Sequence, residues 1–206
     1  MGLFDLLKGG KQKALDNELI DAINAKDTDA AISALERGAD CNAKAEGSAE
    51  KLTALILSAA NGCKEVVQLL VTAGAKVDLP DGAGMTALMW ASKHGNSDVI
   101  EILLRKGADV DRKSETGYTP LLYATEHGQL GAIRILLARG AVVECKDKQN
   151  TTPIMIAAQH GFTEIAALLL QHGADKNYKG LHGKSAMDFA RTSTRTDVLD
   201  MFLTRN

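Results

Sequence analysis

The chain has 206 residues, of which 45% are hydrophobic and 24% are charged, as is ordinary for a globular protein. The formal net charge of -2 gives no support for a polyanion-binding surface, and an aromatic content of 4% argues against base-stacking platforms, so we expect no nucleic-acid partner. No apolar run reaches the roughly 18 residues that a membrane-spanning helix needs.

Residues 1–13 differ from the rest of the chain. Their apolar side chains predict one short helix, which Gly9 and Gly10 are expected to end because glycine resists helix interiors and favours helix ends. These apolar residues are Leu3, Phe4, Leu6 and Leu7. Two interpretations stay open. The segment is a tail or a lid on the structure that follows, or it is a weak interfacial membrane anchor whose lysines meet anionic headgroups.

From residue 14 onward the sequence repeats itself with a period of 33 residues. A hydroxyl residue recurs at Thr53, Thr86, Thr119, Thr152 and Ser185, and two glycine columns recur at 62/95/128/161 and at 74/107/140/173. A fixed period of this length indicates a stack of supersecondary units with one continuous core. The spacing predicts a divergent N-terminal capping repeat (14–52), four full repeats (53–85, 86–118, 119–151 and 152–184) and a truncated C-terminal capping repeat (185–206).

In each full repeat the sequence pattern predicts two helices and a linking segment. Threonine is expected to cap the first helix, as at Ala54–Asn61 and Ala87–His94, and a glycine then breaks the chain. The second helix is apolar over a wide arc, as in residues 99–104, which indicates contact on more than one side. A second glycine ends it, and a linking segment of about a dozen residues follows.

The terminal repeats are more polar, as units with one face in water should be. Asp21 and Asn24 occupy positions that correspond to Leu57 and Ala60.

Several stretches carry a family resemblance. The period, together with Thr119-Pro120-Leu121, residues 157–161 (AAQHG) and residues 103–111 (LLRKGADVD), resembles ankyrin repeats over about residues 14–206. The resemblance implies an all-α ankyrin-repeat solenoid of helix-turn-helix units joined by β-hairpin-like fingers. It also implies that the protein binds other proteins through a concave face and finger tips and is not an enzyme.

One departure from the family pattern affects how repeats contact each other. The family commonly places histidine at the fourth position of its motif, where it links neighbouring repeats by hydrogen bonds. This chain has Ile56, Met89, Leu122, Met155 and Asp188 there. We therefore expect apolar contacts between repeats.

His94, His127 and His160 form a column that suggests a metal site, but their spacing excludes one. Packed helices lie about 8–10 Å apart, whereas zinc ligands lie about 2 Å from a shared ion. We expect half-exposed imidazoles, no metal and no cofactor. Such a row would make partner binding sensitive to pH.

Trp90 and Tyr123 share a first-helix position with Leu57, Ile156 and Phe189. They are expected to pack in the core, or else to serve as aromatic anchors for a partner. The aspartates of the linking segments, Asp81, Asp109 and Asp147, fit local turn hydrogen bonds better than acid–base chemistry.

The three cysteines, Cys41, Cys63 and Cys145, lack the spacing of a disulfide framework or zinc site. They indicate reduced thiols in a cytoplasmic protein.

These patterns predict a monomeric scaffold or adaptor that recognises a protein partner on a preformed surface. The alternative is a peripheral membrane adaptor anchored by residues 1–13. The expected partner-binding residues lie at finger tips and first-helix ends. They are Met85, Trp90, Lys93, His94, Glu115, Tyr118, Glu126, His127, Lys148, Gln149, Thr151, Gln159, His160, Leu181, His182 and Lys184.

Overall fold

The computed structural model describes residues 3–45, 51–180, 183–192 and 197–204. Within these ranges the chain is helical, with turns and one isolated antiparallel bridge between Lys44 and Thr53. The prediction of an all-α repeat solenoid is confirmed. The helices are α1 (Leu3–Asn24), α2 (Thr28–Glu36), α3 (Ala54–Asn61), α4 (Lys64–Thr72), α5 (Ala87–His94), α6 (Ser97–Arg105), α7 (Pro120–Glu126), α8 (Leu130–Ala138), α9 (Pro153–His160), α10 (Thr163–Gln171), α11 (Ala186–Thr192) and α12 (Asp197–Thr204).

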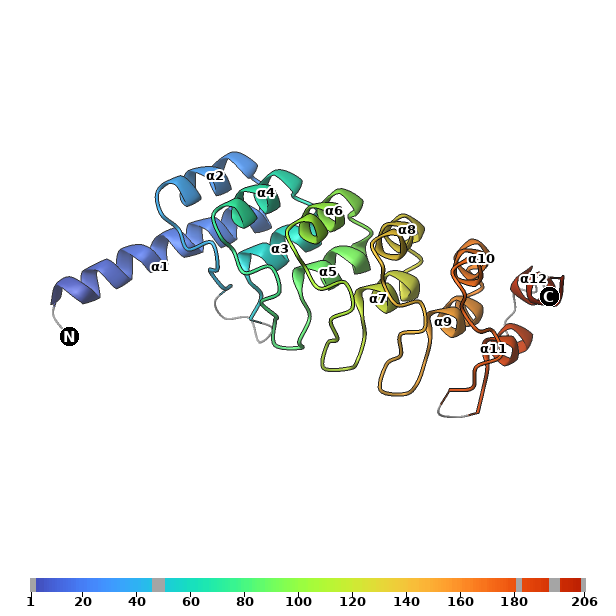
Figure 1. Ribbon diagram of the computed structural model, residues 1–206. Coiled ribbons are helices and arrows are strands. Elements are labelled where there is room, and N and C mark those ends of the chain that lie inside the picture. The colour runs from blue at the N-terminus through green and yellow to red at the C-terminus, as the bar shows by residue number, and fades with distance from the viewer. Residues whose placement is uncertain (1–2, 46–50, 181–182, 193–196, 205–206) are drawn as a thin grey trace. The chain divides into compact units, whose positions relative to one another are not determined.

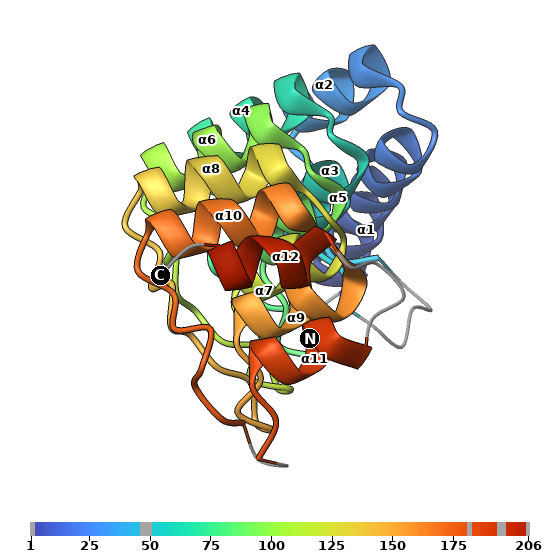
Figure 2. The same ribbon diagram turned by 90° about the vertical axis from the view of Figure 1, so that its right-hand side faces the viewer.

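The chain forms two compact units. Unit 1 comprises residues 1–91 and 98–108, and unit 2 comprises residues 92–97 and 109–206. In unit 1, α1 packs against both α2 and α3, and α4 packs against α2 and α3 (Figure 1). In unit 2, the first helices α7, α9 and α11 form one row and the second helices α8, α10 and α12 form another (Figure 2).

The apolar side chains of the second helices form much of each core. In α6 of unit 1, Val99, Ile100, Ile102 and Leu103 are each at most 3% exposed. The first helices contribute small residues, so that neighbouring helices approach closely. Ala59, Ala124 and Ala157 are fully buried.

The contacts expected in place of the family's histidine are apolar, as predicted. Ile56, Met89, Leu122 and Met155 are each at most 1% exposed. Asp188 behaves differently, because Ser185 donates to it through both its backbone N–H and its hydroxyl, while Ser185 Oγ accepts from Asp188 N. This reciprocal cap begins α11 and holds the pKa of the Asp188 carboxyl below its usual value, chiefly through the Ser185 backbone donor.

The predicted threonine caps are present in most repeats. Thr53 Oγ1 accepts from Ile56 N at 3.1 Å, and Thr119 Oγ1 accepts from Leu122 N at 3.3 Å. The Thr152 side chain makes no such bond, so the prediction is wrong for α9. Both glycine columns have positive φ, between 68° and 73° in the first and between 86° and 93° in the second.

The expected break at Gly9 and Gly10 is wrong, because α1 runs through both residues to Asn24. Neither glycine adopts a positive φ. Glycine costs about 1 kcal/mol relative to alanine in a helix, but adding residues to an existing helix is far easier than starting one. The later part of α1 is fixed to the repeats by Leu19 and Ile23, which are 0% and 1% exposed.

The polar residues expected on the N-terminal capping repeat, Asp21 and Asn24, are both exposed. Among the described residues, no helix is both long enough and apolar enough to cross a membrane.

Candidate functional site

The linking segments form fingers that share one turn geometry. In unit 2 the turn begins at Ser114, Asp147 and Gly180. The N–H of each residue donates to the carbonyl oxygen four positions later, at 2.9, 3.3 and 3.0 Å respectively. The third residue after each of them, Gly117, Asn150 or Gly183, has positive φ and donates back to the carbonyl that opens the turn. This backbone pairing gives the fingers the hairpin-like form that the family resemblance implied.

Aspartate side chains reinforce the turns, as predicted for Asp81 and Asp147. In unit 2, Asp147 Oδ1 accepts from Gln149 N at 2.8 Å and from Thr151 N at 2.7 Å. In unit 1, Asp81 Oδ1 accepts in the same way from Ala83 N and Met85 N. These carboxylates therefore fix finger conformation.

Trp90 and Tyr123 connect a first helix to its own finger. In unit 1, Trp90 Nε1 donates to Asp81 Oδ2 at 2.8 Å. In unit 2, the Tyr123 hydroxyl donates to Ser114 Oγ at 3.3 Å, across the same separation of nine residues. Both aromatic side chains are half-buried, which places them between the two predicted roles of core residue and surface anchor. The repeated contact makes them positioning residues for the fingers.

Tyr118 packs against Tyr123 where the finger meets α7. The two ring centroids lie 5.0 Å apart, and the Tyr118 hydroxyl donates to Glu126 Oε1 at 3.4 Å. Burial, followed by the nearby carboxylates of Glu126 and Asp147, raises the pKa of Tyr118 to about 12. The phenol is neutral at physiological pH and acts as a donor.

A pocket of about 140 Å³ lies in unit 2 between two fingers and the first helices α9 and α11. It is lined by Gln149, Asn150, Thr151, Met155, Gln159, Gly180, Lys184 and Phe189. Four of the sixteen predicted partner-binding residues meet here, namely Gln149, Thr151, Gln159 and Lys184. Met155 and Phe189 add apolar surface that the sequence did not assign to the site.

The absence of a side chain at position 180 keeps this pocket open. A Cβ there would lie 3.0 Å from the Asn150 carbonyl oxygen and 3.5 Å from Met155 Sδ. Glycine thus allows the two fingers to approach each other. On the other side, the Lys184 ammonium lies 5.7 Å from the centroid of the Phe189 ring.

The predicted partner-binding residues differ in exposure. The exposed ones are His94, Glu115, His127, Lys148, Gln149, Gln159, His160 and Lys184, and the half-buried ones are Trp90, Lys93, Tyr118, Glu126 and Thr151. Met85 departs from the expectation, since it is only 7% exposed and its backbone carbonyl closes a finger turn in unit 1. Leu181 and His182 lie outside the described residues.

The histidine column is exposed, where half-exposed imidazoles were expected, and His127 and His160 have different local surroundings. His127 Nδ1 lies 3.1 Å from the Tyr123 carbonyl oxygen of the same helix, and the His160 ring stacks on Phe162 with centroids 5.3 Å apart. No group of histidine, cysteine and acidic residues suited to a metal ion occurs in the part of the chain that the structure describes.

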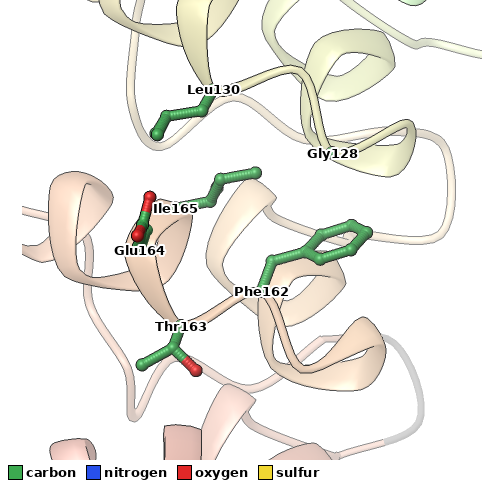
Figure 3. Close-up of a pocket in the computed structure, with 6 residues that line it drawn as sticks. All are labelled: Gly128, Leu130, Phe162, Thr163, Glu164 and Ile165. Atoms are coloured by element: carbon green, nitrogen blue, oxygen red, sulfur yellow. The ribbon is translucent and has the colours of Figure 1, made fainter.

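A second pocket in unit 2, of about 240 Å³, opens at the turns between first and second helices. Figure 3 shows Phe162 and Ile165 on one side of it, with Gly128 and Leu130 across from them. A Cβ at Gly128 would lie 3.2 Å from Phe162 Cζ, so the ring packs closely over this glycine. The sequence reasoning missed Phe162, although it is aromatic where the other full repeats have Cys63, Asn96 and Gln129.

The cysteines are free thiols in this structure. Cys145 is buried and its Sγ accepts from Thr119 Oγ1 at 3.2 Å. Burial raises its pKa to about 11, so this thiol is protonated and inert at neutral pH.

Comparison with known proteins agrees with the repeat architecture. A search of curated proteins found no match for this chain. A family model for ankyrin repeats in three copies matches residues 19–114, 81–147, 112–180 and 143–206. Proteins built from these repeats are generally protein–protein interaction modules and typically non-enzymatic scaffolds. With matches that extend from residue 19 to residue 206, and a helix pair in each repeat, the chain belongs to the ankyrin-repeat family.

Proposed function

We propose that this chain binds a protein partner on the surface formed by the fingers and first-helix ends of unit 2. The observation that carries the proposal is the pocket of about 140 Å³, in which Gln149, Gln159 and Lys184 meet above Met155 and Phe189. An apolar floor with a polar rim is the usual composition of a protein interface.

The mechanism is rigid presentation of this surface. The finger turns are closed by their own backbone hydrogen bonds, and Asp147 adds two more. Because the fingers are ordered before binding, association loses less conformational entropy than it would with flexible loops.

A pair of matched variants tests the proposal. Gln159 and Gln171 are both exposed and lie in the same repeat, on the first helix α9 and the second helix α10 respectively. Affinity purification from the source organism, with Gln159→Arg and Gln171→Arg as baits, should show loss of the specific partner only for Gln159→Arg. Both variants should keep the wild-type melting temperature. Undiminished capture by Gln159→Arg would place the binding surface elsewhere.

Membrane anchoring through residues 1–13 stays the alternative prediction. The continuity of α1 supports it, since residues 3–11 are helical ahead of Gln12, which contacts the first repeat. This attachment begins at Gln12, whose Nε2 donates to the Gly38 carbonyl oxygen at 2.9 Å. Co-sedimentation with anionic liposomes should therefore compare the full chain with one that lacks residues 1–9. Equal sedimentation of the two proteins would rule the anchor out.

A cytoplasmic location and a monomeric state also stay predictions. The free thiols suit a reducing compartment. Light scattering of the purified chain would test the monomeric state.

A further inference from the structure

Each finger of unit 2 has more cationic residues than the finger of unit 1 that the structure describes in full. These unit 2 fingers are the segments 109–118, 142–151 and 175–184, apart from residues 181–182. Their cationic residues are Arg112, Lys113, Lys146, Lys148, Lys176, Lys179 and Lys184. The equivalent unit 1 finger, residues 76–85, has one cationic residue, Lys76, and two carboxylates, Asp78 and Asp81.

Most acidic side chains in the unit 2 fingers are engaged with backbone amides. Asp111 accepts from Val142 N, Glu144 accepts from Asp175 N, and Asp175 accepts from Asn177 N, each at 2.8 to 2.9 Å. These carboxylates, like that of Asp147, are directed toward the backbone by their bonds. Glu115 is exposed at one tip beside the cations.

Six of these seven cations divide into three that contact other parts of the chain and three that are available to a partner. Lys113 Nζ donates to the Lys146 carbonyl at 3.1 Å, Lys146 Nζ lies 3.7 Å from the centroid of the Tyr178 ring, and Lys176 Nζ donates to the Phe202 carbonyl. Lys148, Lys179 and Lys184 are exposed on two successive fingers, and Lys184 also lines the pocket.

We propose that the unit 2 fingers bind an extended acidic peptide segment that places one apolar side chain in the pocket above Met155 and Phe189. This inference rests on the proposed function and names the chemistry of its partner. Lys184 lies at the pocket rim, so a carboxylate next to the apolar residue would meet it. Lys148 and Lys179 would meet further carboxylates along the segment.

The repeat spacing sets the spacing of the acidic residues. Neighbouring helices lie about 8–10 Å apart, and an extended chain rises about 3.3 Å per residue. A peptide that crosses successive fingers therefore advances about three residues per repeat. Carboxylates about three positions apart would face Lys148 and Lys179, which lie on successive fingers.

A nucleic acid fits this surface less well. The exposed carboxylate of Glu115 lies among the cations and would repel a continuous row of phosphates. An acidic peptide needs only separate cations on the protein surface, with one apolar contact between them.

Selection from a display library of random 12-residue peptides against the full chain tests the inference. Enriched sequences should carry Asp or Glu about every three residues, near one Leu, Met, Ile or Phe. The double variant Lys148→Glu with Lys179→Glu should bind the best synthetic peptide about tenfold more weakly than the wild type does. Added salt should reduce this difference in affinity. The matched control is Arg134→Glu in α8 with Arg139→Glu at the C-cap of that helix. Both arginines are exposed, and this double variant should change the affinity by less than about twofold.

Several outcomes would overturn the inference. The enriched peptides could lack the acidic spacing, or peptides with each Asp or Glu replaced by Asn or Gln could bind equally well. The two double variants could lose equal amounts of peptide affinity, or a 12-nucleotide oligothymidylate could bind more tightly than the peptide. A library that yields no enriched sequence would also overturn the inference. The proposed function fails separately, if Gln159→Arg leaves native partner capture intact. Peptides that lack the acidic spacing but lose binding to Gln159→Arg would contradict the inference alone.

Discussion

The threonine that opens each first helix has a hydrogen-bonded role in some repeats and not in others. Thr119 Oγ1 accepts from Leu122 N and donates to Cys145 Sγ. Thr152 is 0% exposed, and its hydroxyl has no hydrogen-bond partner among the described residues. A buried polar group without a partner costs about 1–3 kcal/mol of stability. The same residue type therefore stabilises one repeat and weakens another.

Replacing these threonines with valine should have opposite consequences. Thr119→Val should lower the free energy of unfolding by about 1 kcal/mol, because it leaves Leu122 N without its cap. Thr152→Val should leave that free energy unchanged or raise it, because it removes an unsatisfied hydroxyl. Urea denaturation of the two variants beside the wild type provides the measurement. Equal destabilisation by both would show that Thr152 has a partner in solution.

Tyr118 should make stability depend on alkaline pH. Its pKa rises from 10.0 to about 12 on folding, mainly because of burial, so the folded state favours the neutral phenol. This contribution is fully present below pH 10 and is lost as the pH rises toward 12. Between about pH 9 and pH 11.5, Tyr118→Phe should therefore lose less unfolding free energy than the wild type does. Identical losses would mean that Tyr118 titrates normally in the folded protein.

At the scale of the element, the conformation of a finger depends on its turn residue and on how closely the next finger approaches that residue. Gly117 has φ of +86°, and a Cβ there would lie 2.9 Å from the Lys148 backbone nitrogen of the next finger. Gly140 at the end of α8 has the same φ but no atom within 4 Å of the added Cβ. Gly117 therefore bears two constraints, a left-handed backbone and a close approach between fingers, whereas Gly140 bears only the first.

Alanine substitutions at the two glycines separate these constraints. Gly140→Ala should cost about 1–2 kcal/mol, the usual penalty for a left-handed L-residue. Gly117→Ala should cost more, because the backbone it meets belongs to a neighbouring finger and cannot rotate away. Thermal denaturation gives the ranking, and equal losses would indicate that the fingers separate easily. Gly117→Ala should also weaken partner capture, since it displaces the finger that contains Gln149.

At the scale of the whole molecule, the main helix contacts described within each unit join helices of the same repeat or of adjacent repeats. In unit 2, for example, α9 packs with α7, α10 and α11, while α12 packs with α10 and α11. The stability of such a chain is close to a sum of repeat and nearest-neighbour contributions. A defect in a terminal repeat should therefore remain local.

Phe202→Ala tests this locality. Phe202 is 0% exposed in α12, and its truncation should cost about 3–5 kcal/mol. Hydrogen exchange should show loss of protection in α11 and α12, with much less change in α7 and α8. The neighbouring Leu203 is 58% exposed, so Leu203→Ala serves as the control and should change little. Uniform loss of protection across residues 119–206 would indicate instead a single cooperative unit.

The sequence by itself determined the repeat, its helix boundaries and most of its caps. Ala54–Asn61 and Ala87–His94 have the predicted bounds. These features follow from local chemistry, because a capping hydroxyl, a turn glycine and an apolar face act within a few residues of their own position. The exposed end-of-helix residues, such as Gln159 and His160, were predictable for the same reason.

Only the tertiary structure decided which of these residues meet. The continuity of α1 through Gly9 and Gly10 depends on docking further along that helix, at Leu19 and Ile23. The burial of Met85 and the pocket between the fingers depend on side chains from other segments, such as Phe189 beside Gln149. Such contacts join residues far apart along the chain, and their energies depend on distances that no local pattern specifies.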